Sequence, residues 1–251
     1  MCVDVVALRA YVGRGRASRM THAHLERHRS HVGGWLRAAV LGANDGVGST
    51  ASLVLGVAAA QTSIAGTITA GLAGLVGGAL SMAAGEYVSV SSQRDVEQAD
   101  LATERRELAT QPEHELRELT GIYVAKGLDE ALARQVAQAL TDKGDPLRVH
   151  AREELGIDPD ALARPTQAAL VSCIAFAAGA ALPLLAISVT PAPYRIGVTL
   201  GSALVALGAL GGWSARLGGA PVPRAVVRVL VGGALAMGLT MGIGAIFGVS
   251  A

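Results

Sequence analysis

Carboxylates are unevenly distributed along this chain, and their grouping indicates a segment that could bind cations. Of the 20 acidic residues, 16 lie between Asp95 and Asp160. At 100° per residue, six of them share one helical stripe about 80° wide. These six are Glu97, Asp100, Glu104, Glu107, Glu115 and Glu118. No member has a Lys or Arg three or four residues later, so the like charges repel one another unless something neutralises them.

Two interpretations of this stripe remain open. Most charge runs are solvated helix faces. A row of carboxylates also suits divalent cations such as Fe²⁺, Mn²⁺, Mg²⁺ and Ca²⁺, and carboxylates at i and i+3 can share one ion. Pro112 lacks a backbone donor and predicts a kink or break between Glu107 and Glu115. The angular argument therefore holds better within each half of the stripe than across it.

A short helical pattern later in the same acidic region could add ligands. It carries His150, Glu153 and Glu154, with His150 and Glu154 on one face at i, i+4. This helix could complete a metal site beside the stripe. Alternatively, it is a surface helix whose Arg148 and Arg152 pair with its own acids.

A second set of candidate ligands lies in an apolar region. Between residues 38 and 93 only Asp45 and Glu86 can ionise, and ionisable groups at membrane depth are costly unless they are paired or functional. Asn44 could add an amide oxygen, and Met82 lies one turn before Glu86 on the same face. A buried Met usually packs in a core, but a thioether beside carboxylates is also a soft ligand that favours transition metals.

The rest of the chain has the composition of packed membrane helices. It is 51% hydrophobic, has 32 glycines and is only 3% aromatic, a mixture typical of closely packed transmembrane helices. Five apolar segments are each long enough to cross a bilayer. They span residues 36–60, 64–92, 166–190, 195–215 and 225–248. The sequence thus predicts an all-α membrane protein with five transmembrane helices and a three-helix acidic insert between the second and third.

Four regions follow from this pattern: a tail over 1–34, two membrane helices over 35–93, the insert over 94–164 and three membrane helices over 165–251. Within the insert, further helices are expected over about 129–140 and 145–155. Basic residues gather in the tail, the insert and the loop after residue 215, whereas the opposite side has only Arg195. The positive-inside rule therefore places the N-terminus and the insert in the cytoplasm.

The tail and the two cysteines carry weaker signals. About thirty polar residues precede the first apolar segment, so we expect that segment to remain as a membrane helix and not to be a cleaved signal. The tail holds Arg residues and the histidines 22, 24, 28 and 31. It is expected to be attracted to anionic lipid, with metal sensing as the alternative. Cys2 and Cys173 lie in different kinds of segment and are expected to be structural or incidental.

Several motifs resemble those of the vacuolar iron transporter family, and the resemblance covers roughly residues 31–250. The motifs are Asn44-Asp45-Gly46, Ser81-Met82-Ala83-Ala84-Gly85-Glu86-Tyr87, the pairs Glu104/Glu107 and Glu115/Glu118, and Ala180-Ala181-Leu182-Pro183-Leu184. The resemblance implies a five-helix protomer that works as a homodimer in a lipid bilayer. It also implies export of cytosolic Fe²⁺, and often Mn²⁺, in exchange for protons, with no cofactor and no enzymatic reaction.

The same resemblance implies roles for individual residues. Asp45 and Met82 would be the ion-translocating pair in a pathway at the dimer interface. The ligands of a cytoplasmic metal-binding domain would be Glu104, Glu107, Glu115, Glu118 and Glu154. Two positions depart from the family pattern: Glu86 matches members that generally lack the acidic insert, and His150-Ala151 stands where Met or Glu is expected.

A metal sensor or storage protein that binds ions without moving them is the alternative function. The intramembrane carboxylates and Met82 favour transport, because a sensor would not need them. Nucleic-acid binding and nucleotide hydrolysis have no support, since no phosphate-binding Gly-rich loop precedes a helix. The Ala, Gly and Arg content fits a bacterial chain, which would place it in the cell membrane; a vacuolar or other compartment membrane is the alternative location.

Overall fold

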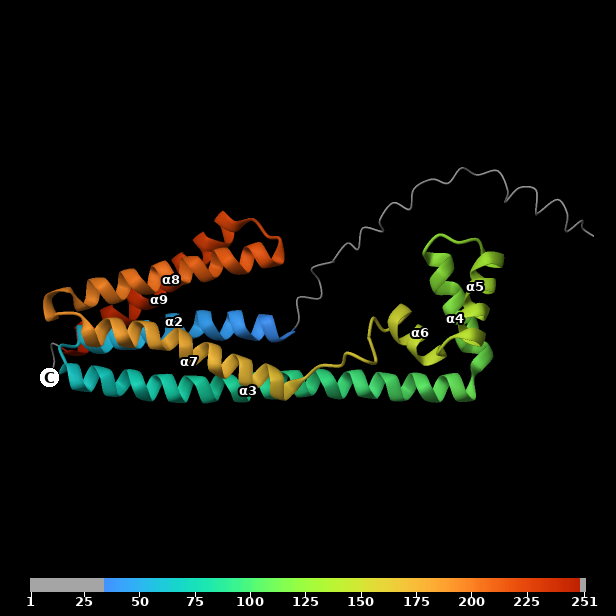
Figure 1. Cartoon of the computed structure of the whole chain (residues 1–251), viewed down its shortest axis with the longest axis horizontal. Coiled ribbons are helices and arrows are strands. Elements are labelled where there is room, and N and C mark those ends of the chain that lie inside the picture. Colours follow the sequence, from blue (N-terminus) through green and yellow to red (C-terminus); the bar gives the residue numbers. More distant parts are fainter. Residues whose placement is uncertain (1–33, 249–251) are drawn as a thin grey trace, which may run out of the picture. The chain divides into compact units, whose positions relative to one another are not determined.

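A computed structural model describes residues 34–248 of the chain. Cys2 and the tail histidines, for which lipid attraction or metal sensing was expected, lie outside the described residues. Within 34–248 the secondary structure is helical, without strands, as the sequence predicts. The helices are α2 (Gly34–Ala59), α3 (Ile64–Thr110), α4 (Pro112–Ala125), α5 (Glu130–Lys143), α6 (Pro146–Glu153), α7 (Pro165–Val189), the short η2 (Ala192–Tyr194), α8 (Arg195–Gly218) and α9 (Val222–Gly248) (Figure 1).

Four of these helices are long and apolar enough to cross a membrane: α3, α7, α8 together with η2, and α9. The chain is therefore a membrane protein with four spans recognisable by length and composition. The remaining predicted span, the segment over 36–60, forms α2, a helix of 26 residues. Its centre carries Asn44, Asp45 and several hydroxyls, so α2 lacks an uninterrupted stretch as apolar as those of the other four.

The α2 helix nevertheless lies at the centre of the helix packing, with its most extensive contacts to α7 and further contacts to α3, α8 and α9. Glycines allow the close approach of α2 and α7. A Cβ atom on Gly46 would lie 2.2 Å from the Phe176 carbonyl oxygen, and one on Gly179 would lie 2.4 Å from that of Ala43. Any side chain at these positions would force the two backbones apart, so the small residues fix this packing.

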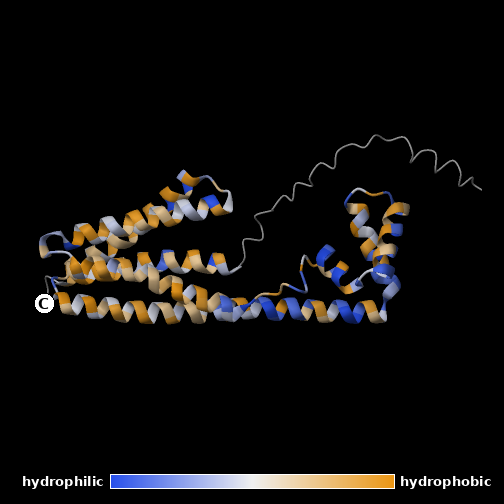
Figure 2. Ribbon diagram, viewed as in Figure 1, coloured by the Kyte–Doolittle hydropathy of each residue, from blue (hydrophilic) through white to orange (hydrophobic). Residues whose placement is uncertain are grey.

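The α3 helix runs without interruption for 47 residues. Its first part is apolar and its second part is strongly polar (Figure 2), so one rigid helix continues from the membrane into the acidic region. It ends at Thr110, and Pro112 occupies the first turn of α4, where its missing donor has no cost. The break predicted at Pro112 is confirmed, and it divides the acidic stripe between two helices.

Three short helices follow within the region 94–164. Asp129 caps α5 by accepting a hydrogen bond from the Leu132 amide, and Asp145 caps α6 in the same way, as is usual at helix N-termini. A small apolar core holds these helices together. It consists of Leu116, Leu119 and Ala137, with Tyr123 and Val149 packed against them.

Candidate functional site

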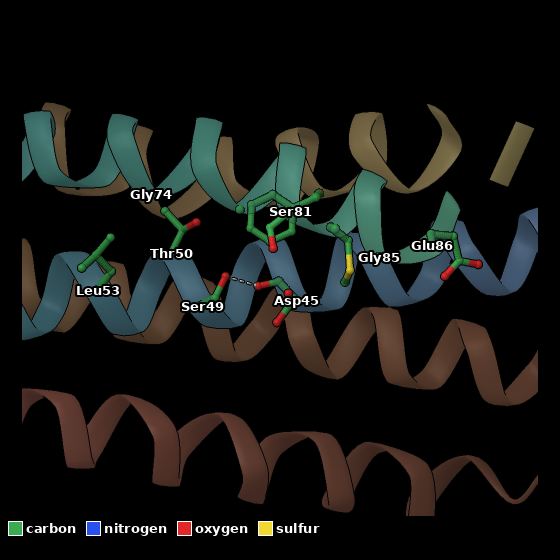
Figure 3. Close-up of a pocket in the computed structure, with 11 residues that line it drawn as sticks. Asp45, Ser49, Thr50, Leu53, Gly74, Ser81, Gly85 and Glu86 are labelled. Carbon is green, nitrogen blue, oxygen red and sulfur yellow. Dashed lines mark hydrogen bonds between the residues drawn. The ribbon is translucent and has the colours of Figure 1, made fainter. Parts of the chain in front are cut away.

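The first candidate site is a cavity of about 440 Å³ between α2 and α3 (Figure 3). It contains three of the four residues predicted for ion translocation, Asp45, Met82 and Glu86. Its full lining is Asp45, Ser49, Thr50, Leu53, Gly74, Gly78, Ser81, Met82, Gly85, Glu86 and Phe176. Oxygens and a thioether therefore meet in one cavity beside the apolar part of α3, a ligand set suited to a divalent transition metal.

On α2, the residues that face this cavity form an exposed stripe at four-residue spacing. Asp45, Ser49 and Leu53 line the cavity, and all three are exposed in the protomer, as is Leu41 one turn earlier. The Ser49 hydroxyl donates to the backbone oxygen of Asp45 at 2.6 Å, so this hydroxyl is held by the helix itself. The Asp45 carboxylate has no hydrogen bond or ion pair within the described part of the chain, and it is available to a cation.

On α3, Glu86 and Met82 lie at the same cavity. The Glu86 side chain is only 11% exposed, and its buried Oε1 has no hydrogen-bond partner among residues 34–248. The nearest cation is Arg37 at the start of α2, whose Nη2 lies 4.0 Å from Glu86 Oε1. Met82 also packs against the buried cluster around Phe176, so it both fills space and offers its sulfur to the cavity.

Asn44, the fourth predicted residue, does not line this cavity. It borders a neighbouring cavity of about 720 Å³ between α2, α8 and α9, which also reaches Asp45 and contains Arg228 and Thr240. The Asn44 Oδ1 is buried without a hydrogen-bond partner in the described structure. Successive side chains on a helix point about 100° apart. Asn44 therefore points away from the face of α2 on which Asp45 meets Met82 and Glu86 of α3.

The second candidate site joins α3, α4 and α6. Glu104, Glu115, His150 and Glu154 each offer one ligand atom, and these atoms all lie within 4.8 Å of one another. His150 Nδ1 lies at the centre, 3.0 Å from Glu104 Oε1, 3.8 Å from Glu115 Oε2 and 3.4 Å from Glu154 Oε2. The first three side chains are almost fully buried, whereas Glu154 lies at the rim.

Two buried polar atoms of this second site have no hydrogen-bond partner among the described residues. Glu104 Oε1 is close to His150 Nδ1 but lacks hydrogen-bond geometry, and both this oxygen and His150 Nε2 are buried without a hydrogen-bond partner among the described residues. Buried polar atoms are normally paired. Ligands at about 2.1 Å from an ion lie about 3.0 Å apart when they are at right angles, so the His150–Glu104 distance suits a shared cation.

The electrostatics of this site also favour a cation. Burial, reinforced by the carboxylates of Glu154, Glu115, Glu107 and Glu118, raises the pKa of Glu104 to about 7. Burial and the charge of Glu118 also raise the pKa of Glu154, against a smaller opposing effect of His150. Desolvation and like charges both disfavour ionised carboxylates, and a bound cation reverses both effects.

Two predicted ligands, Glu107 and Glu118, border the site from α3 and α4. A histidine that the sequence reasoning missed lies next to them: His114 Nδ1 is 3.4 Å from Glu115 Oε1 and 3.7 Å from Glu118 Oε2. Its four-residue spacing from Glu118 was visible in the sequence. Glu115 thus points one oxygen toward His114 and the other toward His150.

Three other predicted ligands are not brought to the site. Glu97 Oε1 accepts from the Gln93 side chain at 2.8 Å, and its Oε2 accepts from the Ala163 amide at 2.9 Å. Glu153 forms an ion pair with Lys126. Asp100 is exposed and lies outside the group of converging ligand atoms. Of the acidic stripe, only the members nearest Pro112, from Glu104 to Glu118, lie at or beside the metal cluster.

The α6 helix, which supplies His150 and Glu154, is held on its other side by two ion pairs. Arg148 pairs with Asp160, and Arg152 Nη2 lies 3.1 Å from Asp158 Oδ2. The predicted alternative, in which these arginines pair with acids of their own helix, is not what the structure shows. The arginines instead bind the segment that leads to α7, and Glu154, the residue that follows α6, lies beside His150 in the cluster.

Comparison with known proteins gives consistent matches over most of the chain. The sequence profile described as the VIT family matches residues 36–245. A protein of Acanthamoeba castellanii named vacuolar iron transporter is 46% identical over 222 residues, which cover 87% of this chain and 82% of that protein. Vacuolar iron transporter homolog 1 of Oryza sativa subsp. japonica is 41% identical over 215 residues, covering 85% and 74% of the two chains. Vacuolar iron transporter homolog 4 of Arabidopsis thaliana is 39% identical over 209 residues, covering 83% and 81%.

Proposed function

Because this chain belongs to the VIT family, whose members are transporters and not enzymes, we propose that it moves divalent transition metal across a membrane. Its substrates are Fe²⁺ and also Mn²⁺, exported from the cytosol in exchange for protons. The observation that carries the proposal is the cavity shared by Asp45, Met82 and Glu86 beside the apolar part of α3. Carboxylates at membrane depth are costly and are not needed for the helices to pack, which supports a functional role for them.

In this proposal α2 is the fifth transmembrane helix. Its 26 residues are long enough to cross a hydrocarbon core of about 30 Å. It packs against four helices that are long and apolar enough to cross a membrane. The lower hydropathy of α2 then reflects the polar residues that line the transport route and does not indicate a soluble helix.

The exposed stripe of α2 supports a homodimer. Asp45 and Ser49 are exposed in one protomer, and a carboxylate that faces lipid would be costly. A second copy of the chain, placed with its own α2 against this stripe, would cover both side chains and present a second carboxylate to the same ion. The transport route then lies at the interface between the two protomers.

The region between α3 and α7 is, in this proposal, a cytoplasmic domain that collects metal. The basic residues of the tail, of this region and of the adjoining ends of α8 and α9 support a cytoplasmic location. Its ligands are Glu104, Glu115, His150 and Glu154, with Glu107 and Glu118 beside them. A nitrogen ligand among carboxylates suits Fe²⁺ and Mn²⁺ and their neighbours better than Mg²⁺ or Ca²⁺.

Proton coupling follows from competition at the intramembrane carboxylates. A carboxylate can hold either a proton or a cation, and the release of metal at the far side leaves it ready to take up a proton. Asp45 is the acid that we assign to this exchange, because its carboxylate has no partner within the described residues. Glu86 is the second candidate, since it lies at the same cavity.

The test uses purified protein in liposomes that enclose a metal-quenched dye, with an imposed pH gradient and Fe²⁺ or Mn²⁺ added without oxygen. We expect dye quenching that depends on the gradient and that Asp45→Asn abolishes. Glu130→Gln, an exposed carboxylate change on α5, is the matched control and should transport normally. Equal transport by Asp45→Asn protein would refute the proposed route.

The alternative function, a membrane-bound metal sensor or store, is favoured by one observation, the buried and under-satisfied cluster around His150. The same experiment separates the two functions. Tight binding of metal to the protein without any flux into the liposomes would support the sensor, whereas flux that needs Asp45 supports the transporter.

A further inference from the structure

A third cavity, of about 430 Å³, lies where α2, α3 and α7 meet at the end of the apolar region. Val90 of α3 and Ala168 of α7 line it, and both belong to a buried apolar cluster that also includes Ala38 of α2. The α2 and α7 helices begin here, and α3 continues from here into its polar part. The cavity thus lies at the level of the membrane surface, on the side that carries the basic loops.

The rim of this cavity combines positive charge with polar donors and an aromatic ring. It includes Arg37, Arg164, Gln93, Gln167 and Trp35, and Trp35 is 49% exposed. Tryptophan is enriched at the depth of lipid headgroups, and Arg is suited to bidentate binding of phosphate. An apolar floor below and two guanidinium groups at the rim match a phospholipid, with the acyl chains beside the protein and the phosphate at the rim.

The one carboxylate in the lining, Glu97, forms no ion pair with Arg37 or Arg164 within the described residues. Each oxygen of Glu97 accepts a hydrogen bond instead, one from the Gln93 side chain and the other from the Ala163 amide. Glu97 therefore ties the segment before α7 to α3 and shapes the wall of the cavity. Arg164 is the residue before the first turn of α7, and its side chain makes no capping hydrogen bond.

Arg37 connects this cavity to the ion route. It lines the surface cavity, and its Nη2 also lies 4.0 Å from Glu86 Oε1, a carboxylate of the Asp45 and Met82 cavity. Its side chain is 68% exposed, so it has room to turn from one partner to the other. While Arg37 stays beside Glu86, its positive charge repels a divalent cation that approaches this carboxylate.

We propose that the Trp35–Arg37–Arg164 cavity binds the phosphate of an anionic phospholipid and that this lipid draws Arg37 away from Glu86, which opens the ion route to metal. Anionic lipid thereby becomes an activator of transport. The binding half of the proposal stands on the cavity alone, and its effect on flux rests on the proposed transport function.

Binding is measured first, without any need for transport. The chain has two Trp residues, and Trp213→Phe leaves Trp35 as the only emitter. Vesicles hold fixed amounts of phosphatidylglycerol and phosphatidylcholine, and the brominated quencher is placed on one lipid or on the other. We expect Trp35 emission to be quenched at least about twofold more strongly when phosphatidylglycerol carries the bromine. Equal quenching by the two labelled lipids would overturn the proposal.

Variants test whether Arg37 and Arg164 cause the preference for phosphatidylglycerol. Arg164→Gln and Arg37→Gln should each reduce the preferential quenching, whereas Arg224→Gln, an exposed arginine change in the first turn of α9, should retain it. Inorganic phosphate added to phosphatidylcholine vesicles should leave Trp35 emission unchanged. A change in emission would assign the cavity to a free anion and refute the lipid.

Flux is then compared at saturating metal, so that metal accumulation at a charged surface does not limit the rate. We expect phosphatidylglycerol to raise wild-type flux by at least about twofold over phosphatidylcholine alone. Arg37→Gln should reach the stimulated rate in phosphatidylcholine alone, and Arg164→Gln should lose the stimulation. Flux of Arg37→Gln that still depends on phosphatidylglycerol would refute the role of Arg37. Preferential quenching without any metal flux would contradict the proposed transport function and leave the lipid site standing.

Discussion

Metal binding by the His150 cluster should depend steeply on pH near neutrality, because Glu104 must lose its proton before it can bind an ion. With a pKa of about 7, about three quarters of Glu104 is ionised at pH 7.5 and about 3% at pH 5.5. This one group therefore predicts a loss of affinity of about 25-fold between these two pH values. At the ordinary value of 4.5, the same calculation predicts a loss of only about 10%.

The measurement is titration of the full-length protein with Mn²⁺, which resists oxidation, in competition with a fluorescent chelator whose own pH dependence is known. The dissociation constant is compared at pH 7.5 and 5.5. Because the pKa of Glu154 is also raised, the observed loss should equal or exceed that from Glu104 alone. A dissociation constant that changes by less than about twofold would refute the argument that burial and like charges hold the proton on Glu104.

A variant separates the two causes of the shift. The charge of Glu154 is the largest Coulombic contribution to the raised pKa of Glu104, after burial. Glu154→Gln should therefore weaken Mn²⁺ binding at pH 7.5 and also reduce the ratio between the two pH values, because Glu104 then ionises at lower pH. The control Glu130→Gln, an exposed change on α5, should keep both the affinity and the ratio of the wild type.

Three further outcomes are expected. The metal-free protein should lose thermal stability as pH rises from about 4.5 to about 7, because folded Glu104 holds its proton more tightly than in the unfolded chain; a Tm series in detergent tests this, and added Mn²⁺ should reverse the loss. Gly46→Ala should lower Tm by an amount equivalent to about 1–3 kcal/mol, because its Cβ meets the Phe176 carbonyl, whereas Gly48→Ala, with open space around it, should leave Tm unchanged or higher. Arg152→Ala should weaken Mn²⁺ binding by less than about fivefold, since it removes an exposed ion pair that only positions α6; a complete loss of binding would show that this pair is essential for the site.

The positions of the helices could be predicted closely from the sequence, because long apolar segments and Pro residues determine them locally. The segment predicted over 166–190 is α7 at Pro165–Val189, and Pro112 does begin a new helix. The continuation of α3 beyond the apolar region also has a local cause. Its apolar pattern ends near residue 92, but its polar half has no helix-breaking residue before Pro112, so the first half of the acidic stripe lies on the same helix.

The membership of the metal cluster was only partly predictable, because it depends on how α6 docks onto α3 and α4. Angular spacing grouped Glu97 with Glu104, but the Ala163 amide binds Glu97. Spacing also gave His150 and Glu154 a common face without showing whether that face meets Glu104. The ion pairs of Arg148 and Arg152 with the segment before α7 join residues that no local pattern relates.

The unbroken α3 helix also limits how the two sites can cooperate. Glu86 and Glu104 lie on this one helix, 18 positions apart, which corresponds to about 27 Å at 1.5 Å per residue. At that distance no single ion can be held by both residues. In the proposed transport, a metal ion leaves the His150 cluster before it reaches Glu86, and a cluster that held its ion too tightly would slow transport. The pH-dependent carboxylate Glu104 provides a physical means of release, because protonation weakens the cluster while the rest of the fold stays in place. In the proposed transport function, the cluster therefore raises the local concentration of metal near the membrane, and Arg37 beside Glu86 is the proposed point at which entry is controlled.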